Sequence, residues 1–169
     1  MKVFGKQKDF TPVREDGSRV IISYGYADVD SKNATWQEIH LYKKQVSNVS
    51  LADVKNAVIA DINARTDEKI LSGFVWNEIP VWLSTENQSN FKAAYDINVQ
   101  NKGALLPMKF KLGEDASGAA VYHTFETMAD FKDFYLAAVA YVNQCLNDGW
   151  EEKDDIDWTP YETFFGANG

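Results

Sequence analysis

The stretch SGFVWNEIPVWLSTENQSNFKAAYD, residues 72–96, contains two short strand-like segments followed directly by the start of a helix. The segments FVWN and IPVWLS are rich in β-branched and aromatic residues and surround an Asn-Glu pair, which predicts a tight hairpin. Pro80 lacks a backbone N–H, so the second strand is expected at an edge or at a bulge. Thr85 and Gln88 form a capping-box pair, which predicts a helix with Thr85 as its N-cap.

The two tryptophans of this stretch, Trp76 and Trp82, have more than one possible role. We expect both rings to pack mainly in the core, between the hairpin and the flanking helices. A glycan-stacking or protein-contact role stays open, because a two-stranded element with an edge proline often lies at a surface.

Upstream of the hairpin, the sequence predicts strands and then one helix. Residues 1–46 have a β and loop pattern, with strands expected in RVIISYGYADV (19–29) and in the alternating segment TWQEIHLYK (35–43). A Ser-x-x-Asp cap and helical spacing of apolar residues predict a helix over 50–71. Gly73 is expected to end it in the left-handed conformation.

Downstream, the pattern is a second hairpin, a long helix and an unusual tail. LPMKFKLG (106–113) and AAVYHTF (119–125) are predicted strands joined by a Gly/Asp/Ser-rich turn. Thr127 is the expected N-cap of the last long helix, and Gly149 its expected C-cap. The acidic tail after Gly149 carries five aromatic residues, so we expect it to lie against another surface.

These elements predict an α+β fold, with short antiparallel strands and hairpins packed against three helices and a β-rich N-terminal segment. We divide the chain into a docking segment at residues 1–46 and an α+β body at 48–169. Deletion of the docking segment is then expected to leave a folded body that no longer docks.

Composition excludes several classes of protein. The chain has 169 residues and a net charge of -8, which disfavours a nucleic-acid partner. Its single cysteine cannot form an internal disulfide, and no apolar run is long enough to span a bilayer. The first residues lack the apolar core of a signal peptide. We therefore expect a soluble protein made in a cytoplasm, with no membrane partner.

A search for catalytic chemistry returns no strong motif. His40 and His123 lie in predicted strands without a second ligand at metal-site spacing, and Cys145 lies on an apolar helix face. The acidic run EEKDDID (151–157) lacks the geometry of a calcium loop and is read as a solvated run. We predict no catalytic, cofactor-binding or metal residues. A glycan hydrolase with two carboxylates is the least favoured alternative.

Four segments, in this order, resemble a domain family of unknown function in virion proteins of tailed bacteriophages, including crAss-like phages and gut prophages. They are ILSGFVWNEIPVWLSTENQSNFKAAYD, LPMKFKLGED, VYHTFETMADFKDFYLAAVAYVNQCLNDGW and KDDIDWTPYE. The resemblance covers about residues 48–162. Glu78 departs from it, because the family commonly has a small residue such as glycine at this hairpin turn. The resemblance implies a structural, non-enzymatic component of a head fibre, a tail fibre or a collar.

The expected function is therefore assembly into a virion, after synthesis in the bacterial host cytoplasm. The expected partners are other virion proteins and copies of the chain itself, as a dimer or trimer. Six aromatic residues are the candidate partner contacts: Trp36, Tyr42, Trp158, Tyr161, Phe164 and Phe165. The alternative is a carbohydrate-binding module for host-surface recognition, in which Trp36, Trp76 and Trp82 stack on sugar rings.

Overall fold

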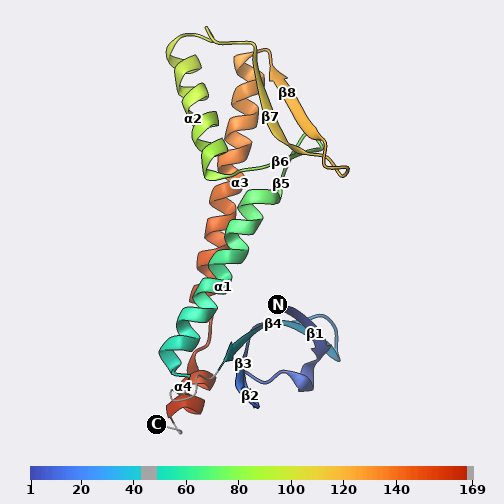
Figure 1. Cartoon of the computed structure of the whole chain (residues 1–169), viewed down its shortest axis with the longest axis vertical. Coiled ribbons are helices and arrows are strands. Elements are labelled where there is room, and N and C mark those ends of the chain that lie inside the picture. The colour runs from blue at the N-terminus through green and yellow to red at the C-terminus, as the bar shows by residue number, and fades with distance from the viewer. Residues whose placement is uncertain (43–48, 167–169) are drawn as a thin grey trace. The chain divides into compact units, whose positions relative to one another are not determined.

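The computed structural model describes residues 1–42 and 49–166 and has the predicted α+β fold (Figure 1). The chain divides into two compact units, the first formed by Met1–Ala64 with Trp150–Gly169 and the second by Arg65–Gly149. The predicted boundary between residues 46 and 48 lies outside the described residues.

The first unit contains a four-stranded antiparallel sheet, with the strands in the order β1-β4-β3-β2. The strand expected at 19–29 is confirmed as β3, and the strand expected at 35–43 is confirmed as β4 up to Tyr42, the last described residue before the gap. The two strands pair with a bulge between Tyr24 and Ala27. The elements of the sheet are β1 (Lys2–Lys6), the 3-10 turn η1 (Gln7–Asp9), β2 (Val13–Asp16), β3 (Arg19–Asp28) and β4 (Asn33–Tyr42).

One face of this sheet packs on helices from distant parts of the sequence. The helix α1 (Leu51–Ser72) begins in this unit, and the short helix α4 (Thr159–Gly166) lies near the C-terminus. The shared core is formed by Val13, Val20, Ile22 and Tyr24 of the sheet, Val54, Val58 and Ile62 of α1, and Tyr161 of α4. Removal of residues 1–46 would therefore uncover the apolar face of α1.

The second unit holds two hairpins, the helix α2, most of α3 and the last residues of α1. Backbone pairing joins the hairpins, because the Trp82 N–H donates to the Leu112 carbonyl at 2.8 Å. One side of the hairpins covers a core rich in aromatic rings, including Trp76, Phe125 and Phe134. The elements are β5 (Phe74–Trp76), β6 (Ile79–Val81), α2 (Thr85–Gln100), β7 (Met108–Glu114), β8 (Ala120–Phe125) and α3 (Met128–Asp154).

The predicted tight hairpin is confirmed, and its turn needs an uncommon backbone conformation. Asn77 and Glu78 both have positive φ, 48° and 65°, as the two central residues of a type I′ turn require. Glycine adopts this conformation without steric cost, which explains why a small residue is the expected occupant of position 78.

The N-cap of α2 was predicted one residue too late. The hydroxyl of Ser84, not that of Thr85, accepts a hydrogen bond from the backbone N–H of Asn87 at 3.2 Å. Thr85 is the first helical residue, and the Gln88 side chain donates to the Leu83 carbonyl instead of closing a capping box. The caps at Ser50 and Thr127 are confirmed, since each hydroxyl accepts the backbone N–H three residues later.

Two glycines predicted as helix caps have a different role. Gly73 does not have positive φ, and a Cβ atom there would clash with the hydroxyl of Tyr141. Gly149 lies inside α3, and a Cβ atom there would come within 2.5 Å of the Thr66 hydroxyl. Both positions are glycine because a neighbouring side chain approaches the backbone closely. No described helix is both long and apolar enough to cross a membrane.

Candidate functional site

The structure separates the six predicted partner contacts by exposure. Trp36 and Tyr161 are buried, with 4% and 3% of their surfaces exposed, and they present no area to a partner unless the fold opens. Tyr42 is 69% exposed at the end of β4 and is accessible.

The remaining three predicted partner contacts pack against the unit to which they belong. Trp158, Phe164 and Phe165 are partly buried and pack against the core of the first unit. The ammonium group of Lys55 lies 5.3 Å from the centre of the Trp158 ring and 3.0 Å from the carboxylate of Glu162. The aromatic tail therefore covers α1 of the same chain, and its outer edges are the part left accessible.

A buried carboxylate lies on the other face of the first sheet. Glu38 is 7% exposed; the Trp36 indole N–H donates to it at 3.0 Å, and Arg14 forms an ion pair at 3.0 Å. Burial opposes ionisation, but the hydrogen bonds from Trp36 and Arg14 outweigh it and lower the pKa of Glu38. His40 lies 3.8 Å from the same carboxylate. Glu38 and Arg14 therefore form an ion pair whose carboxylate is also held by the Trp36 indole.

The described residues contain no group of three or more His, Cys, Asp or Glu side chains that could hold a metal ion. His123 lies 3.3 Å from the Asp130 carboxylate and contacts the Trp76 ring edge-on, with the ring centres 5.0 Å apart. Cys145 is buried, as expected for a core thiol.

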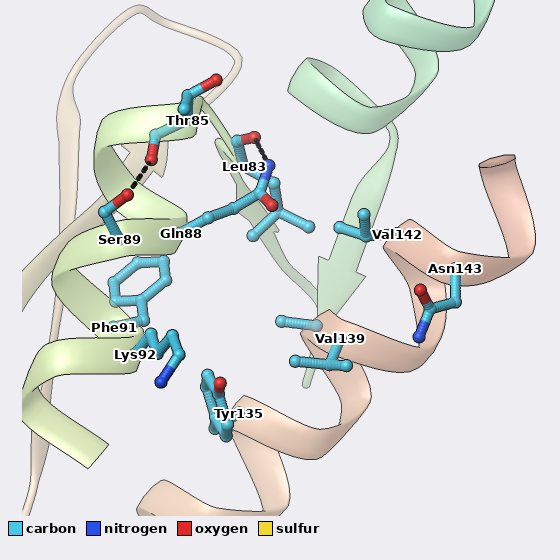
Figure 2. A pocket seen from close by; sticks show the side chains of 11 residues that line it. Leu83, Thr85, Gln88, Ser89, Phe91, Lys92, Tyr135, Val139, Val142 and Asn143 are labelled. Atoms are coloured by element: carbon cyan, nitrogen blue, oxygen red, sulfur yellow. Dashed lines mark hydrogen bonds between the residues drawn. The ribbon is translucent and has the colours of Figure 1, made fainter. Parts of the chain in front are cut away.

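The clearest concave surface lies in the second unit, between the start of α2 and the middle of α3. It is a groove of about 370 Å³, and Figure 2 shows side chains of both helices lining it. Its floor consists of core side chains, Leu83, Phe91 and Ala138. The walls and rim are formed by Thr85, Gln88, Ser89, Lys92, Tyr135, Val139, Val142 and Asn143.

Several polar groups of the groove bond to α2 itself or to the residue that precedes its N-cap. Gln88 donates to the Leu83 carbonyl at 2.6 Å, and the Ser89 hydroxyl donates to the Thr85 carbonyl at 2.8 Å (Figure 2). The Lys92 ammonium pairs with Asp96, one turn further along α2. The surface offered to a ligand is therefore mainly apolar.

Sequence reasoning did not identify this groove, although a signal was present. On α3, Leu136 is 49% exposed and Val139 is 39% exposed. With Asn143 they are spaced three and four residues apart, which places them in a second stripe beside the core-facing one.

The solvent-facing side of the hairpins is a second accessible surface. Trp82 is 39% exposed, so its prediction as a core residue is wrong, whereas Trp76 is buried as expected. The reason is strand alternation: the flanking residues Val81 and Leu83 face the core, which turns Trp82 outward. The ammonium group of Lys111 lies 5.3 Å from the centre of the Trp82 ring.

On the same side, Tyr122 of β8 is 55% exposed, and the Lys109 ammonium lies 4.6 Å from the centre of its ring. The structure thus places two accessible aromatic rings, each beside a lysine, on neighbouring hairpins. The three tryptophans proposed to stack on sugars do not come together on this surface, because Trp36 and Trp76 are buried.

The comparison with family models matches the larger part of the chain. The model of a family described as a domain of unknown function, DUF4376, matches residues 53–166. The match begins within α1 and ends at the last residue of α4, so it includes the groove and both hairpins. No curated protein and no solved structure matches the chain significantly.

Proposed function

The chain belongs to the DUF4376 family of unknown function, and we propose that it is a structural component of a tailed-bacteriophage particle that acts by protein–protein assembly. The observation that carries the proposal is the apolar groove between α2 and α3, with the exposed Val139 in its wall and the exposed Leu136 three residues earlier on α3. The particle position is a head fibre, a tail fibre or a collar.

The groove supports assembly because exposed apolar side chains beside an apolar depression are typical of protein-binding surfaces. A groove between two helices accommodates the apolar side chains of a partner helix, and burial of these side chains drives the association. The partner is another virion protein, whose apolar residues would cover Leu136 and Val139.

The sequence resemblance to virion proteins is the second support, and it is independent of the groove. It implies that the chain is made in the cytoplasm of a bacterial host and ends in the particle. Structural parts of particles assemble through symmetric contacts, so copies of this chain are further expected partners.

Quantitative mass spectrometry of purified particles tests the location. We expect the chain at a fixed copy number relative to the portal and capsid proteins. Presence in infected cells together with absence from particles would contradict a structural role and favour an assembly factor.

Substitutions in the groove test the surface. Val139→Asp places a charge on the apolar rim and is expected to remove the chain from particles without changing its melting temperature. Val99→Asp is the matched control, because Val99 lies on α2, is 53% exposed and does not line the groove. Equal incorporation of both variants would contradict a role for the groove in assembly.

Carbohydrate binding is the second candidate function, and the outward Trp82 and Tyr122 favour it. Aromatic rings at a surface stack on the apolar faces of sugars, and the neighbouring lysines can bind acidic substituents. Titration with host surface polysaccharides should change the tryptophan fluorescence of the wild type, and the change should be lost in Trp82→Phe/Tyr122→Ala. An unchanged wild-type spectrum with every polysaccharide would exclude this candidate.

A further inference from the structure

The strand β8 lies at an edge of the strand arrangement in the second unit. Among the described residues it pairs with β7 alone, whereas β7 also receives the Trp82 N–H from the other hairpin. Figure 1 shows β8 at the margin of its hairpin. An edge strand directs every second backbone N–H and C=O away from its partner, so β8 retains groups able to pair with another strand.

The side chains of β8 do not protect this edge. Proteins usually block an edge strand with charged residues, above all lysine, or with proline. The first sheet follows this rule: its edge strand β1 carries Lys2 and Lys6, and β2 carries Arg14 with two acidic residues. The segment AVYHTF, Ala120–Phe125, contains neither a Lys, Arg, Asp or Glu residue nor a proline.

We propose that β8 pairs antiparallel with β8 of a second copy of this chain, with Tyr122 opposite its symmetry mate. In this register Ala120 lies opposite Thr124 of the second copy, and two aromatic rings face each other on the solvent side. His123 then lies opposite Val121, which keeps the two histidines from facing each other. The pairing joins the hairpins of two copies into one sheet.

Charge favours self-pairing of two copies through β8 over self-pairing through β1, an edge strand of the first sheet. Antiparallel self-pairing of β1 about Phe4 would place Lys2 opposite Lys6 of the second copy, and like charges in this position repel. Self-pairing of β8 opposes no charged residue. The inference rests on the proposed assembly function, since it names the second copy as a partner and β8 as its surface.

The β8–β8 interface is small, so its detection in solution needs a high protein concentration. Stable interfaces bury about 1,200–2,000 Å², more than one six-residue strand pair provides. Association in solution is therefore expected at high protein concentration. In a particle, neighbouring copies held by other contacts have a high effective concentration, which would strengthen the pairing.

Sedimentation equilibrium of the full chain tests the pairing with two variants that differ at one position. Ala120→Lys/Thr124→Lys places lysine opposite lysine across the interface, whereas Ala120→Lys/Thr124→Glu places lysine opposite glutamate. Within one chain, residues 120 and 124 face Glu114 and Lys109 of β7, so the Lys/Glu variant is also compatible with the monomer. Melting temperatures of both variants verify that they fold.

We expect the wild-type mass to rise toward that of two chains with concentration. The Lys/Lys variant should dissociate about ten-fold more readily, and the Lys/Glu variant should associate in a salt-sensitive manner. Amide hydrogen exchange of the wild type should slow within Ala120–Phe125 at high concentration, which provides a measurement without substitutions.

A wild type that remains a single chain at all concentrations, or variants that both associate like the wild type, would overturn the proposal. Weaker association of the Lys/Glu variant than of the Lys/Lys variant would also overturn the stated register. These results leave the particle measurement unaffected, so failure of β8 pairing is distinguishable from failure of the proposed function.

Discussion

The hydroxyl of Tyr161 donates a hydrogen bond to the backbone carbonyl of Ser23 at 2.6 Å, which joins residues 138 positions apart in the chain. The Tyr161 ring is buried, and it connects α4 directly to the central strand β3. The C-terminal helix is therefore part of the first unit's core, and the aromatic residues of the tail stabilise the unit that contains the N-terminus.

The first prediction concerns this hydrogen bond. Tyr161→Phe keeps the ring but leaves the buried Ser23 carbonyl without this donor, so it should lower the free energy of unfolding by about 1–2 kcal/mol. Tyr161→Ala also creates a cavity and should cost about 3–5 kcal/mol. Urea denaturation measures both. Tyr42→Phe, at an exposed position, should change stability by less than ~0.5 kcal/mol. An equally small effect of Tyr161→Phe would show that the bond contributes little.

The second prediction concerns alkaline pH. Burial raises the pKa of Tyr161 from 10.0 to about 12, with a smaller contribution from the Asp157 charge. Between these values the unfolded chain loses the phenol proton while the folded chain keeps it, so stability should fall as pH rises from about 10 to 12. Tyr161→Phe should reduce the slope of stability against pH in this window.

Tyr141 provides the comparison for that measurement. Burial raises its pKa to about 12 as well, with a contribution from Cys145. Tyr141→Phe should therefore also reduce the alkaline slope, and the double variant should reduce it further. An unchanged slope in Tyr161→Phe would contradict the raised pKa of Tyr161.

Sequence reasoning identified the elements whose signals are local. The caps at Ser50 and Thr127 depend on a hydroxyl and a backbone N–H three residues apart, and both form as predicted. The alternation along TWQEIHLYK predicted a strand, and the structure forms it as β4, in which Trp36 and His40 both lie beside Glu38. These interactions need no knowledge of distant parts of the chain.

Predictions failed where the deciding contact comes from elsewhere in the sequence. Gly73 and Gly149 have the spacing of helix caps, but their roles depend on Tyr141 and Thr66, which lie far away in the sequence. The exposure of Trp82 depends on which face of a short strand meets the helices. The groove depends on the pairing of α2 with α3, which periodicity within one helix does not reveal.

The third prediction concerns acid stability. The pKa of Glu38 is lowered in the folded state, because the hydrogen bonds from Trp36 and Arg14 outweigh burial. A lowered pKa contributes stability that is present above the unfolded value of 4.5 and is lost as pH falls through the folded value. Glu38→Gln should therefore destabilise the chain near pH 7 and flatten the acid limb of the stability curve.

Glu15→Gln is a control for that variant, because Glu15 is an exposed carboxylate of the same sheet. Denaturation at pH values from 3 to 7 is the measurement for both variants. A Glu38→Gln curve that parallels the wild type throughout this range would contradict a lowered Glu38 pKa.

The fourth prediction separates the two tryptophans of the first hairpin. Trp76 is 5% exposed, and its indole N–H donates to Asp133 at 3.2 Å, so Trp76→Ala should cost about 3–5 kcal/mol. Trp82 is 39% exposed, and Trp82→Ala should cost about 1–2 kcal/mol because less area leaves the interior. Urea denaturation of the two variants gives the comparison. Equal costs would contradict the outward placement of Trp82.

The last prediction concerns the contact between Gly149 of α3 and Thr66 of α1. A Cβ atom at position 149 would lie 2.5 Å from the Thr66 hydroxyl and 3.4 Å from its methyl group. Gly149→Ala should therefore destabilise the second unit by about 1–3 kcal/mol, although alanine is the better helix former. Thr66→Ala removes both contacting atoms, so the double variant Thr66→Ala/Gly149→Ala should recover most of the loss. A double-mutant cycle by urea denaturation measures this coupling, which should exceed about 0.5 kcal/mol. If the free-energy changes of the two single variants simply add, the contact between Thr66 and position 149 carries no coupling, and glycine is not required at position 149.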